Sequence, residues 1–141
     1  MKIKFQKLFE DTILPTYAHA GDAGLDLYSR EEKVLAPSEI YAVSLGFALE
    51  IPHGYVSRIL DRSGLALKHG LHCLAGVVDA GYRGEYKAII TNLGQKEYKI
   101  EKADRIAQML IQPVEICELE EAESLSESER GKGGFGASGK K

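Results

Sequence analysis

One ten-residue stretch, Gly76–Glu85 (GVVDAGYRGE), combines residue types that can do chemistry on a small molecule. Asp79 supplies a carboxylate, Tyr82 supplies an aromatic ring three residues later, and glycines lie on both sides of them. Glycine permits positive φ and lets the backbone come close to a ligand. An acid in this setting suits a site that holds a flat base and activates a water molecule. The plainer interpretation is a turn with no further role, because Asp and Gly are ordinary turn residues.

Two further segments combine charged groups with strand and helix signals. In Ala20–Ser29 (AGDAGLDLYS), Asp26 stands between two leucines. A carboxylate there needs a partner or an ion unless it stays at the surface. In Asp61–His69 (DRSGLALKH), Arg62 and Ser63 stand at the start of a predicted helix. Free N–H groups and the helix dipole favour anions at such a position, and a guanidinium matches phosphate. A capped surface helix is the alternative.

The last two polar segments lie toward the C-terminus. In Ala103–Met109 (ADRIAQM), strand alternation predicts that Ile106 and Gln108 share one face. Gln108 is then placed to donate to a phosphate oxygen, or lies on an ordinary surface strand. Residues 130–141 (RGKGGFGASGKK) hold five glycines, which are costly to order. Phe135 has nothing local to pack on, so we expect it to pack on a ligand or a neighbouring subunit. A frayed terminus is the alternative.

The elements that must position these groups are mostly short strands separated by prolines and glycines. Such a pattern predicts an all-β sandwich or barrel. One helix is predicted at Ser63–Lys68, capped by Ser63 and ended by Gly70. The valines before Asp79 and the β-type run after Glu85 predict a hairpin loop. The predicted strands are Lys2–Phe5, Leu25–Tyr28, Lys33–Leu35, Ile40–Ile51, Tyr55–Leu60, Tyr86–Asn92, Tyr98–Ile100 and Arg105–Ile116.

Composition limits the classes of protein to which the chain can belong. Its 141 residues are enough for one compact domain. The net charge of −3 gives no electrostatic case for nucleic-acid binding. No apolar run approaches the roughly 20 residues of a membrane span. Two unpatterned cysteines, Cys73 and Cys117, and no signal peptide indicate the reducing cytoplasm. A nuclear location stays open if the source is eukaryotic or viral.

Composition also changes along the chain and predicts three parts. Residues 1–120 form the β domain. Seven of the fifteen residues from Glu115 to Glu129 are glutamate, which predicts a solvated acidic linker at 121–129. Residues 130–141 then form a glycine-rich arm that we expect to act as a lid.

In this order and spacing, the five polar segments resemble the five motifs of the homotrimeric dUTPases (dUTP diphosphatases). The resemblance runs from about Ala20 to the C-terminus, and RSGLALKHG, GVVDAGYRGE and RGKGGFGASGK carry most of it. Each motif alone is weak or moderate, but five in order are specific. The resemblance implies a β jelly-roll fold and a homotrimer with shared active sites. It also implies hydrolysis of dUTP to dUMP and pyrophosphate, which limits uracil incorporation into DNA and supplies dUMP for dTMP synthesis.

The resemblance further implies roles for individual residues. Asp79 matches the catalytic carboxylate that activates the water attacking the α-phosphorus. Mg²⁺ is the implied cofactor, held mainly by phosphates and waters, with Asp26 as an indirect support through water. Tyr82 would pack under the deoxyribose, Phe135 would stack on uracil from another subunit's tail, and Arg130 would meet the γ-phosphate. The implied substrate-binding residues are Arg62, Ser63, Gly64, Gly76, Val77, Val78, Tyr82, Lys87, Gln108, Arg130, Gly133, Gly134 and Phe135.

Some positions depart from the family pattern. Asp61 precedes Arg62 where proline or glycine is common, and it brings a negative charge near the triphosphate. The other departures are Gly81, Ala103, Ala137 and Ser138.

Three alternatives to a dUTPase are compatible with parts of this sequence. A dCTP deaminase-like enzyme has a similar fold but would lack this tail, and the H-x-E and P-C-x-x-C signatures of zinc deaminases are absent. A nucleotide-responsive regulatory trimer and a purely structural assembly are the other two. His69, His72 and Cys73 lack a fourth ligand at the spacing of a zinc site, and His19 reads as a turn or surface residue.

Overall fold

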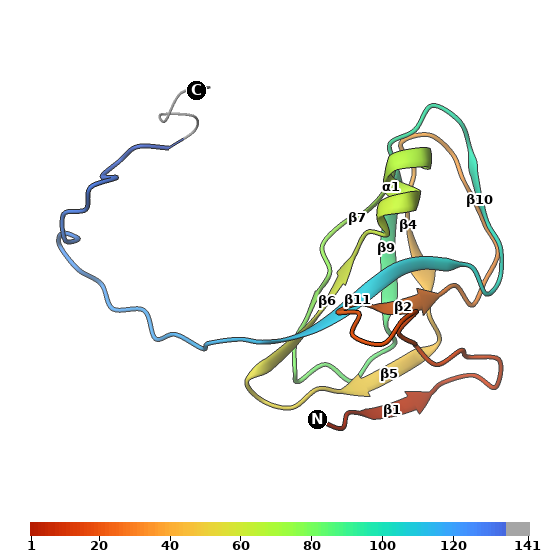
Figure 1. The fold of residues 1–141 in the computed structure, drawn as a ribbon, viewed down its shortest axis with the longest axis horizontal. Coiled ribbons are helices and arrows are strands. Elements are labelled where there is room, and N and C mark those ends of the chain that lie inside the picture. Colours follow the sequence, from red (N-terminus) through yellow and green to blue (C-terminus); the bar gives the residue numbers. More distant parts are fainter. Residues whose placement is uncertain (135–141) are drawn as a thin grey trace.

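The computed structural model of the chain describes residues 1–134 and shows a domain built almost entirely from strands, with one short helix (Figure 1). In chain order the elements are β1 (Lys4–Lys7), β2 (Leu25–Tyr28), β3 (Lys33–Leu35), β4 (Ile40–Ser44), β5 (Phe47–Glu50), β6 (Tyr55–Leu60), α1 (Ser63–His69), β7 (Leu71–Cys73), β8 (Val77–Val78), β9 (Lys87–Asn92), β10 (Tyr98–Ile100) and β11 (Arg105–Pro113).

The strands pair into four antiparallel sheets. The largest has the order β2-β11-β6-β8, a second has the order β4-β9-β7, and the pairs β1-β5 and β3-β10 complete the set. Neighbours in a sheet are mostly distant in sequence, as expected of a Greek-key or jelly-roll topology. The predicted all-β, jelly-roll-like architecture is therefore confirmed.

The core lies between these sheets and draws side chains from all of them. Phe47 of β5 stacks on Tyr86 with ring centroids 5.1 Å apart, and both are almost fully buried. The Tyr86 hydroxyl lies 2.8 Å from Ser57 Oγ of β6, so the one polar atom of that ring is satisfied. Aliphatic side chains such as Leu27, Val43 and Ile90 fill the remaining space.

The predicted strand between Ile40 and Ile51 is wrong as a single element. The chain turns after Ser44, and Gly46 adopts a φ of +77° that ordinary residues rarely take. The turn sends β4 and β5 into different sheets. The last strand also ends at Pro113 rather than at Ile116.

The helix prediction is right in position but wrong about its cap. Helix α1 begins at Ser63, so the residue before it, Arg62, occupies the N-cap position, and no side chain there makes a capping hydrogen bond. The predicted stop is confirmed. Gly70 adopts the left-handed conformation, and its amide donates to the carbonyl of Ala66 at 3.0 Å.

Beyond β11, residues 114–134 extend away from the domain without strand or helix (Figure 1). Val114 donates its amide to the carbonyl of Gly54, and the residues from 114 to 132 are all exposed. Within the described part of the chain, no helix is both long and apolar enough to cross a membrane.

Gly64 within α1 and Gly70, the residue that ends the helix, should respond differently to replacement by alanine. A Cβ on Gly70 would meet the amide nitrogen of Gly94 at 2.7 Å, while one on Gly64 would meet nothing within 4 Å. We expect Gly70→Ala to lower the free energy of unfolding by about 1–3 kcal/mol, because of the left-handed φ and the clash. Gly64→Ala should leave it unchanged or raise it by up to about 1 kcal/mol. Urea denaturation measures both, and equal losses would contradict the packing described here.

Candidate active site

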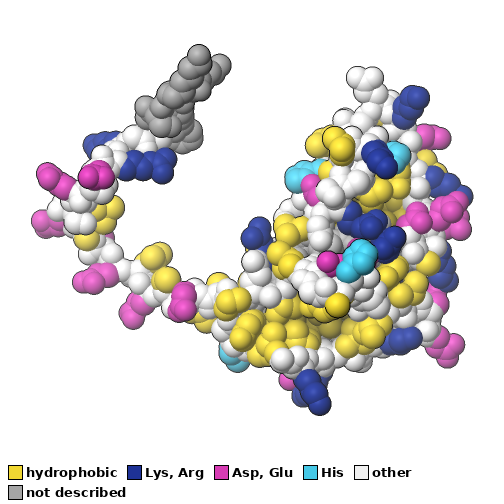
Figure 2. Space-filling model, in the orientation of Figure 1, with side chains coloured by type: hydrophobic (Ala, Val, Ile, Leu, Met, Phe, Trp, Pro, Cys, Tyr) yellow, Lys and Arg dark blue, Asp and Glu magenta, His cyan; other side chains and the backbone are white. Residues whose placement is uncertain are grey.

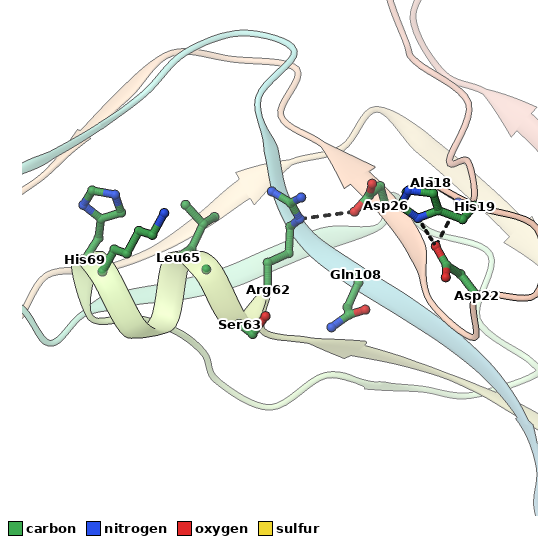
Figure 3. A pocket seen from close by; sticks show the side chains of 11 residues that line it. Ala18, His19, Asp22, Asp26, Arg62, Ser63, Leu65, His69 and Gln108 are labelled. Atoms are coloured by element: carbon green, nitrogen blue, oxygen red, sulfur yellow. Dashed lines mark hydrogen bonds and ion pairs between the residues drawn. The ribbon is translucent and has the colours of Figure 1, made fainter.

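The start of α1 borders a cavity of about 470 Å³, called here the helix-start cavity (Figure 3). It brings together Arg62, Ser63 and Gly64 from the helix, Gln108 from β11 and Asp26 from β2. Four of these five are predicted phosphate ligands, and the fifth is the predicted support of a metal ion. Three segments that are distant in sequence, with Asp26 and Arg62 36 positions apart, therefore meet in one place, as the resemblance implied.

Asp26 is the most constrained charged residue in this cavity. It is 8% exposed, and each carboxylate oxygen has its own arginine. Oδ1 lies 3.2 Å from Arg62 Nε (Figure 3), and Oδ2 accepts a hydrogen bond from Arg105 Nη1 at 3.1 Å. Arg62 also donates through Nη1 to the carbonyl of Arg105 at 2.9 Å. The two arginines compensate the charge of this buried carboxylate. The alternative prediction, that Asp26 lies at the surface, is therefore wrong.

A bulge in β11 aims Arg105 at Asp26. Residues 105 and 107 pair with the adjacent residues Tyr28 and Leu27 of β2, so β11 carries one extra residue at this point. The predicted alternation therefore fails here, because Ile106 and Ala107 are both buried while Gln108 is only half-buried. The turn before the bulge needs a φ of +70° at Ala103, a conformation that glycine adopts more easily than alanine.

Basic side chains that sequence reasoning missed also border the helix-start cavity. Lys68 and His69 lie on its wall, one helical turn after Arg62, Ser63 and Gly64, which are called here the phosphate cradle. The i, i+4 spacing from Gly64 and Leu65 was the signal that could have placed them. His19, expected in a turn or at the surface, is indeed exposed, and its Nδ1 lies 3.2 Å from Asp22 Oδ2 (Figure 3). Figure 2 shows lysine, arginine and histidine side chains gathered close to α1 on this face.

Asp79 and Tyr82 line a different hollow of about 550 Å³, called here the edge-strand cavity. Val77 and Val78 of β8 and Lys87 of β9 also border it, so most of the predicted base- and sugar-binding residues are together. Asp79 is exposed, and its carbonyl accepts a hydrogen bond from the amide of Tyr82 at 3.1 Å. This cavity shares no lining residue with the helix-start cavity.

The predicted hairpin around Asp79 is wrong. Strand β8 pairs with β6 in the four-stranded sheet, whereas β9 pairs with β4 and β7 in another. The connection therefore crosses between sheets. Tyr86 directs it, because its amide donates to the carbonyl of Phe47 and its carbonyl accepts from Leu45.

Gly76 has a structural reason to be glycine. Its φ is +110°, and a Cβ would collide with the carbonyl oxygen of Ile59 on β6. Its own carbonyl accepts a hydrogen bond from the Ile59 amide at 2.8 Å. The close backbone approach at this glycine is therefore to β6.

The C-terminal predictions fall mostly at or beyond the limit of the described residues. Arg130 donates through Nε to the carbonyl of Gly133 at 2.9 Å, across a turn formed by residues 129–132. None of these three residues lines either cavity. Phe135, Ala137 and Ser138 lie outside the described residues.

The two cysteines occupy opposite environments. Cys117 is exposed and Cys73 is buried, and neither forms a disulfide. Burial, together with the nearby Asp61 carboxylate, raises the pKa of the Cys73 thiol to about 12. Across residues 1–134, no group of three His, Cys, Asp or Glu side chains could hold a metal ion.

Comparison with known proteins identifies the family. A dUTPase family profile matches residues 10–139. The chain belongs to the dUTPase family. The deoxyuridine 5'-triphosphate nucleotidohydrolase of Clostridioides difficile is 48% identical over 139 residues, which is 97% of each chain. The dUTPase of Staphylococcus bacteriophage 80alpha, solved with dUpNHpp, is 33% identical with a TM-score of 0.93, and the match covers 98% of both chains.

A second solved dUTPase bears on the metal. The enzyme of phage phi11 of S. aureus, described with a structural Mg(II) ion, is 29% identical with a TM-score of 0.82, covering 88% of this chain and 98% of that one. These matches confirm the dUTPase resemblance and make the chain an enzyme of that class. The individual roles of its site residues remain predictions.

Thiol labelling tests the buried position of Cys73. At pH 8 its thiol should stay protonated and unreactive, because its pKa of about 12 lies far above that pH and the side chain is buried. We expect iodoacetamide to modify Cys117 alone in the folded protein and both cysteines in guanidinium chloride. Peptide mass spectrometry reads the two sites separately. Rapid labelling of Cys73 in the native protein would contradict the packing of β7 described here.

Proposed function

We propose that this chain hydrolyses dUTP to dUMP and pyrophosphate, with Asp79 as general base for a water that attacks the α-phosphorus. The observation that supports this most directly is the gathering of Arg62, Ser63, Gly64 and Gln108 in one cavity of a dUTPase-family chain. In the cytoplasm, where unpaired cysteines persist, the reaction would limit uracil incorporation into DNA. It would also supply dUMP for dTMP synthesis.

The charge of the helix-start cavity favours a triphosphate. Two guanidiniums pair with the carboxylate of Asp26, so this triad is net positive. On the cavity wall, Lys68 adds a cation and Asp22 adds an anion. Arg62 and Gln108 would donate to phosphate oxygens, while Ser63 would contact the bridging oxygen that leaves with pyrophosphate. Fixed donors aimed at the oxygens where charge develops lower the barrier without reorganising at the moment of reaction.

The residues of this cavity fit a magnesium ion that the substrate itself carries. Two carboxylates, Asp22 and Asp26, border the cavity, which is the number that Mg²⁺ uses when phosphates and waters complete its shell. Both Asp26 oxygens already have arginine partners, so Asp26 would support the ion through water. When bound, Mg²⁺ neutralises charge on the phosphates.

The edge-strand cavity supports the selection of uracil. Strand β8 lies at the edge of its sheet, with β6 on one side only, so the main chain of Val77 and Val78 offers its other edge to a base. Cytosine would present a donor where uracil presents an acceptor, leaving buried groups unpaired. Tyr82 would pack under the deoxyribose and exclude a 2′-hydroxyl, with Lys87 on the wall of the same hollow.

The separation of the two cavities supports a homotrimer with shared sites. In one chain the phosphate cradle and Asp79 lie in hollows without a common residue. A complete site would then join the helix-start cavity of one copy to the edge-strand cavity of a second. The arm of a third copy, from Arg130 through Gly133 and Gly134 to Phe135, would close over the nucleotide and exclude water.

Removing the base should separate chemistry from binding. Asp79→Asn keeps the shape but not the basicity, so we expect the rate of dUTP hydrolysis to fall by at least ~100-fold. Affinity for dUpNHpp should change by less than about threefold, because the residue contributes to the transition state rather than to ground-state binding. Pyrophosphate release and calorimetry measure the two quantities, and normal turnover would overturn the assignment of the base.

A panel of dUTP, dCTP, dTTP and UTP with Mg²⁺ tests the reaction itself on the wild-type protein. Pyrophosphate from dUTP alone is the expected result. Ammonia from dCTP would favour the deaminase alternative, and binding without turnover would favour the regulatory trimer.

Mixed assemblies test whether the site is shared. Arg62→Ala and Asp79→Asn chains should each form inactive trimers. If Arg62 and Asp79 of one site come from different copies, random co-assembly restores about one site in four. Selection for both tags removes the two homotrimers and leaves one restored site in three, so we expect the co-expressed, doubly tagged trimers to recover about a third of wild-type activity. No recovery would place both residues of a site in the same chain.

A further inference from the structure

Asp61 directly follows β6, and its side chain contacts β7, although these two strands belong to different sheets. Its Oδ1 accepts a hydrogen bond from the amide of Cys73 at 2.5 Å, and its Oδ2 lies 2.8 Å from Nδ1 of His72. Both carboxylate oxygens therefore face β7. Although burial alone would raise the pKa of the Asp61 carboxyl, its hydrogen bonds to Cys73 and His72 hold that pKa below the ordinary value. The side chain is accordingly an ionised acceptor at neutral pH.

The main chain of the same residue fixes a second phosphate ligand. Gln108 of β11 donates through Nε2 to the carbonyl of Asp61 at 2.7 Å. The next residue, Arg62, is held in extended geometry (φ −89°, ψ 122°) as the helix N-cap. Asp61 thus contacts β7 with its side chain, β11 with its carbonyl and the phosphate cradle through the peptide bond.

The direction of the carboxylate decides between two effects on a bound triphosphate. A negative charge beside Arg62 would repel phosphate if it faced the cavity. Instead the Asp61 carboxylate borders neither the helix-start cavity nor a second hollow that shares Asp22, Asp26 and Gln108 with it. Strand β7 supplies the partners of this carboxylate. A carboxylate whose two oxygens are occupied by these partners acts mainly by holding the loop.

We propose that Asp61 is a positioning residue of the phosphate site, whose side chain clamps the β6–α1 loop to β7 so that Arg62, Ser63 and Gln108 keep one arrangement. This rests on the proposed function only in its assignment of that cavity to phosphates. Proline would restrict the loop through its ring. Aspartate does not fix its own backbone dihedral angle in this way. Its side chain instead restrains the loop through two contacts with β7.

The test compares Asp61→Ala with a matched control, Glu39→Ala. Glu39 also accepts a main-chain amide, that of Ala36 at 2.9 Å, and pairs with a cation, Lys33, but it lines neither cavity. We expect Asp61→Ala to raise KM for dUTP about tenfold, as for the loss of a charge-assisted hydrogen bond. Glu39→Ala should leave KM unchanged while lowering the melting temperature by a similar amount.

A conservative variant separates positioning from charge. Asp61→Asn retains an acceptor for the Cys73 amide and removes the charge, so we expect KM within about threefold of wild type. If the carboxylate acted by repelling the substrate, both Asp61 variants would instead lower KM, and that result would overturn the proposal. A wild-type KM in Asp61→Ala would overturn it as well.

Two further measurements keep the inference independent of folding and of turnover. His72→Ala removes only the Oδ2 partner and should raise KM by about threefold. If Asp61→Ala does not fold, an unchanged KM in His72→Ala would refute the clamp. Calorimetry with Mg²⁺ and pyrophosphate requires no hydrolysis, and Asp61→Ala should bind pyrophosphate about tenfold more weakly. If Asp61→Ala binds pyrophosphate more weakly while the wild-type protein does not hydrolyse dUTP, the clamp would be supported and the proposed reaction would be rejected.

Discussion

The carboxylate of Asp26, buried between Arg62 and Arg105, is the interaction on which the arrangement of the phosphate side depends. It joins strand β2, the start of α1 and the bulged end of β11 at one point. A buried carboxylate is costly to leave without partners, so each arginine is held where it compensates that charge. Two cations for one anion leave this triad with a net positive charge, which favours the binding of a polyphosphate beside it.

The two halves of the candidate site lie in two separate cavities of the chain. Strand β6 leads into Arg62 at its end and pairs along its edge with β8, which leads into Asp79. Strand β6 therefore helps to position both Arg62 and Asp79, yet the two cavities have no residue in common. This geometry agrees with the proposed assembly of identical chains, in which each copy would contribute a different half to two different sites.

Particular elements show where sequence reasoning succeeded and where it failed. The stop of α1 at Gly70 was predictable, because a left-handed residue at a helix end is a local requirement that glycine meets. The bulge at Arg105 was not, because strand alternation is disturbed there by pairing with β2. The hairpin around Asp79 failed for a similar reason. The burial of Tyr86, rather than the turn residues, decides which sheet receives the chain.

The sequence by itself determined the dUTPase family, the predominance of strands and the identity of the groups that can do chemistry, since ordered motifs and turn residues are written locally in the chain. Tertiary structure alone decided which groups meet. Asp26 and Arg105 stand 79 positions apart, and nothing between them specifies their contact. The same holds for the contact of Asp61 with β7. Such pairings follow from how several sheets pack around one core, which depends on all strands together.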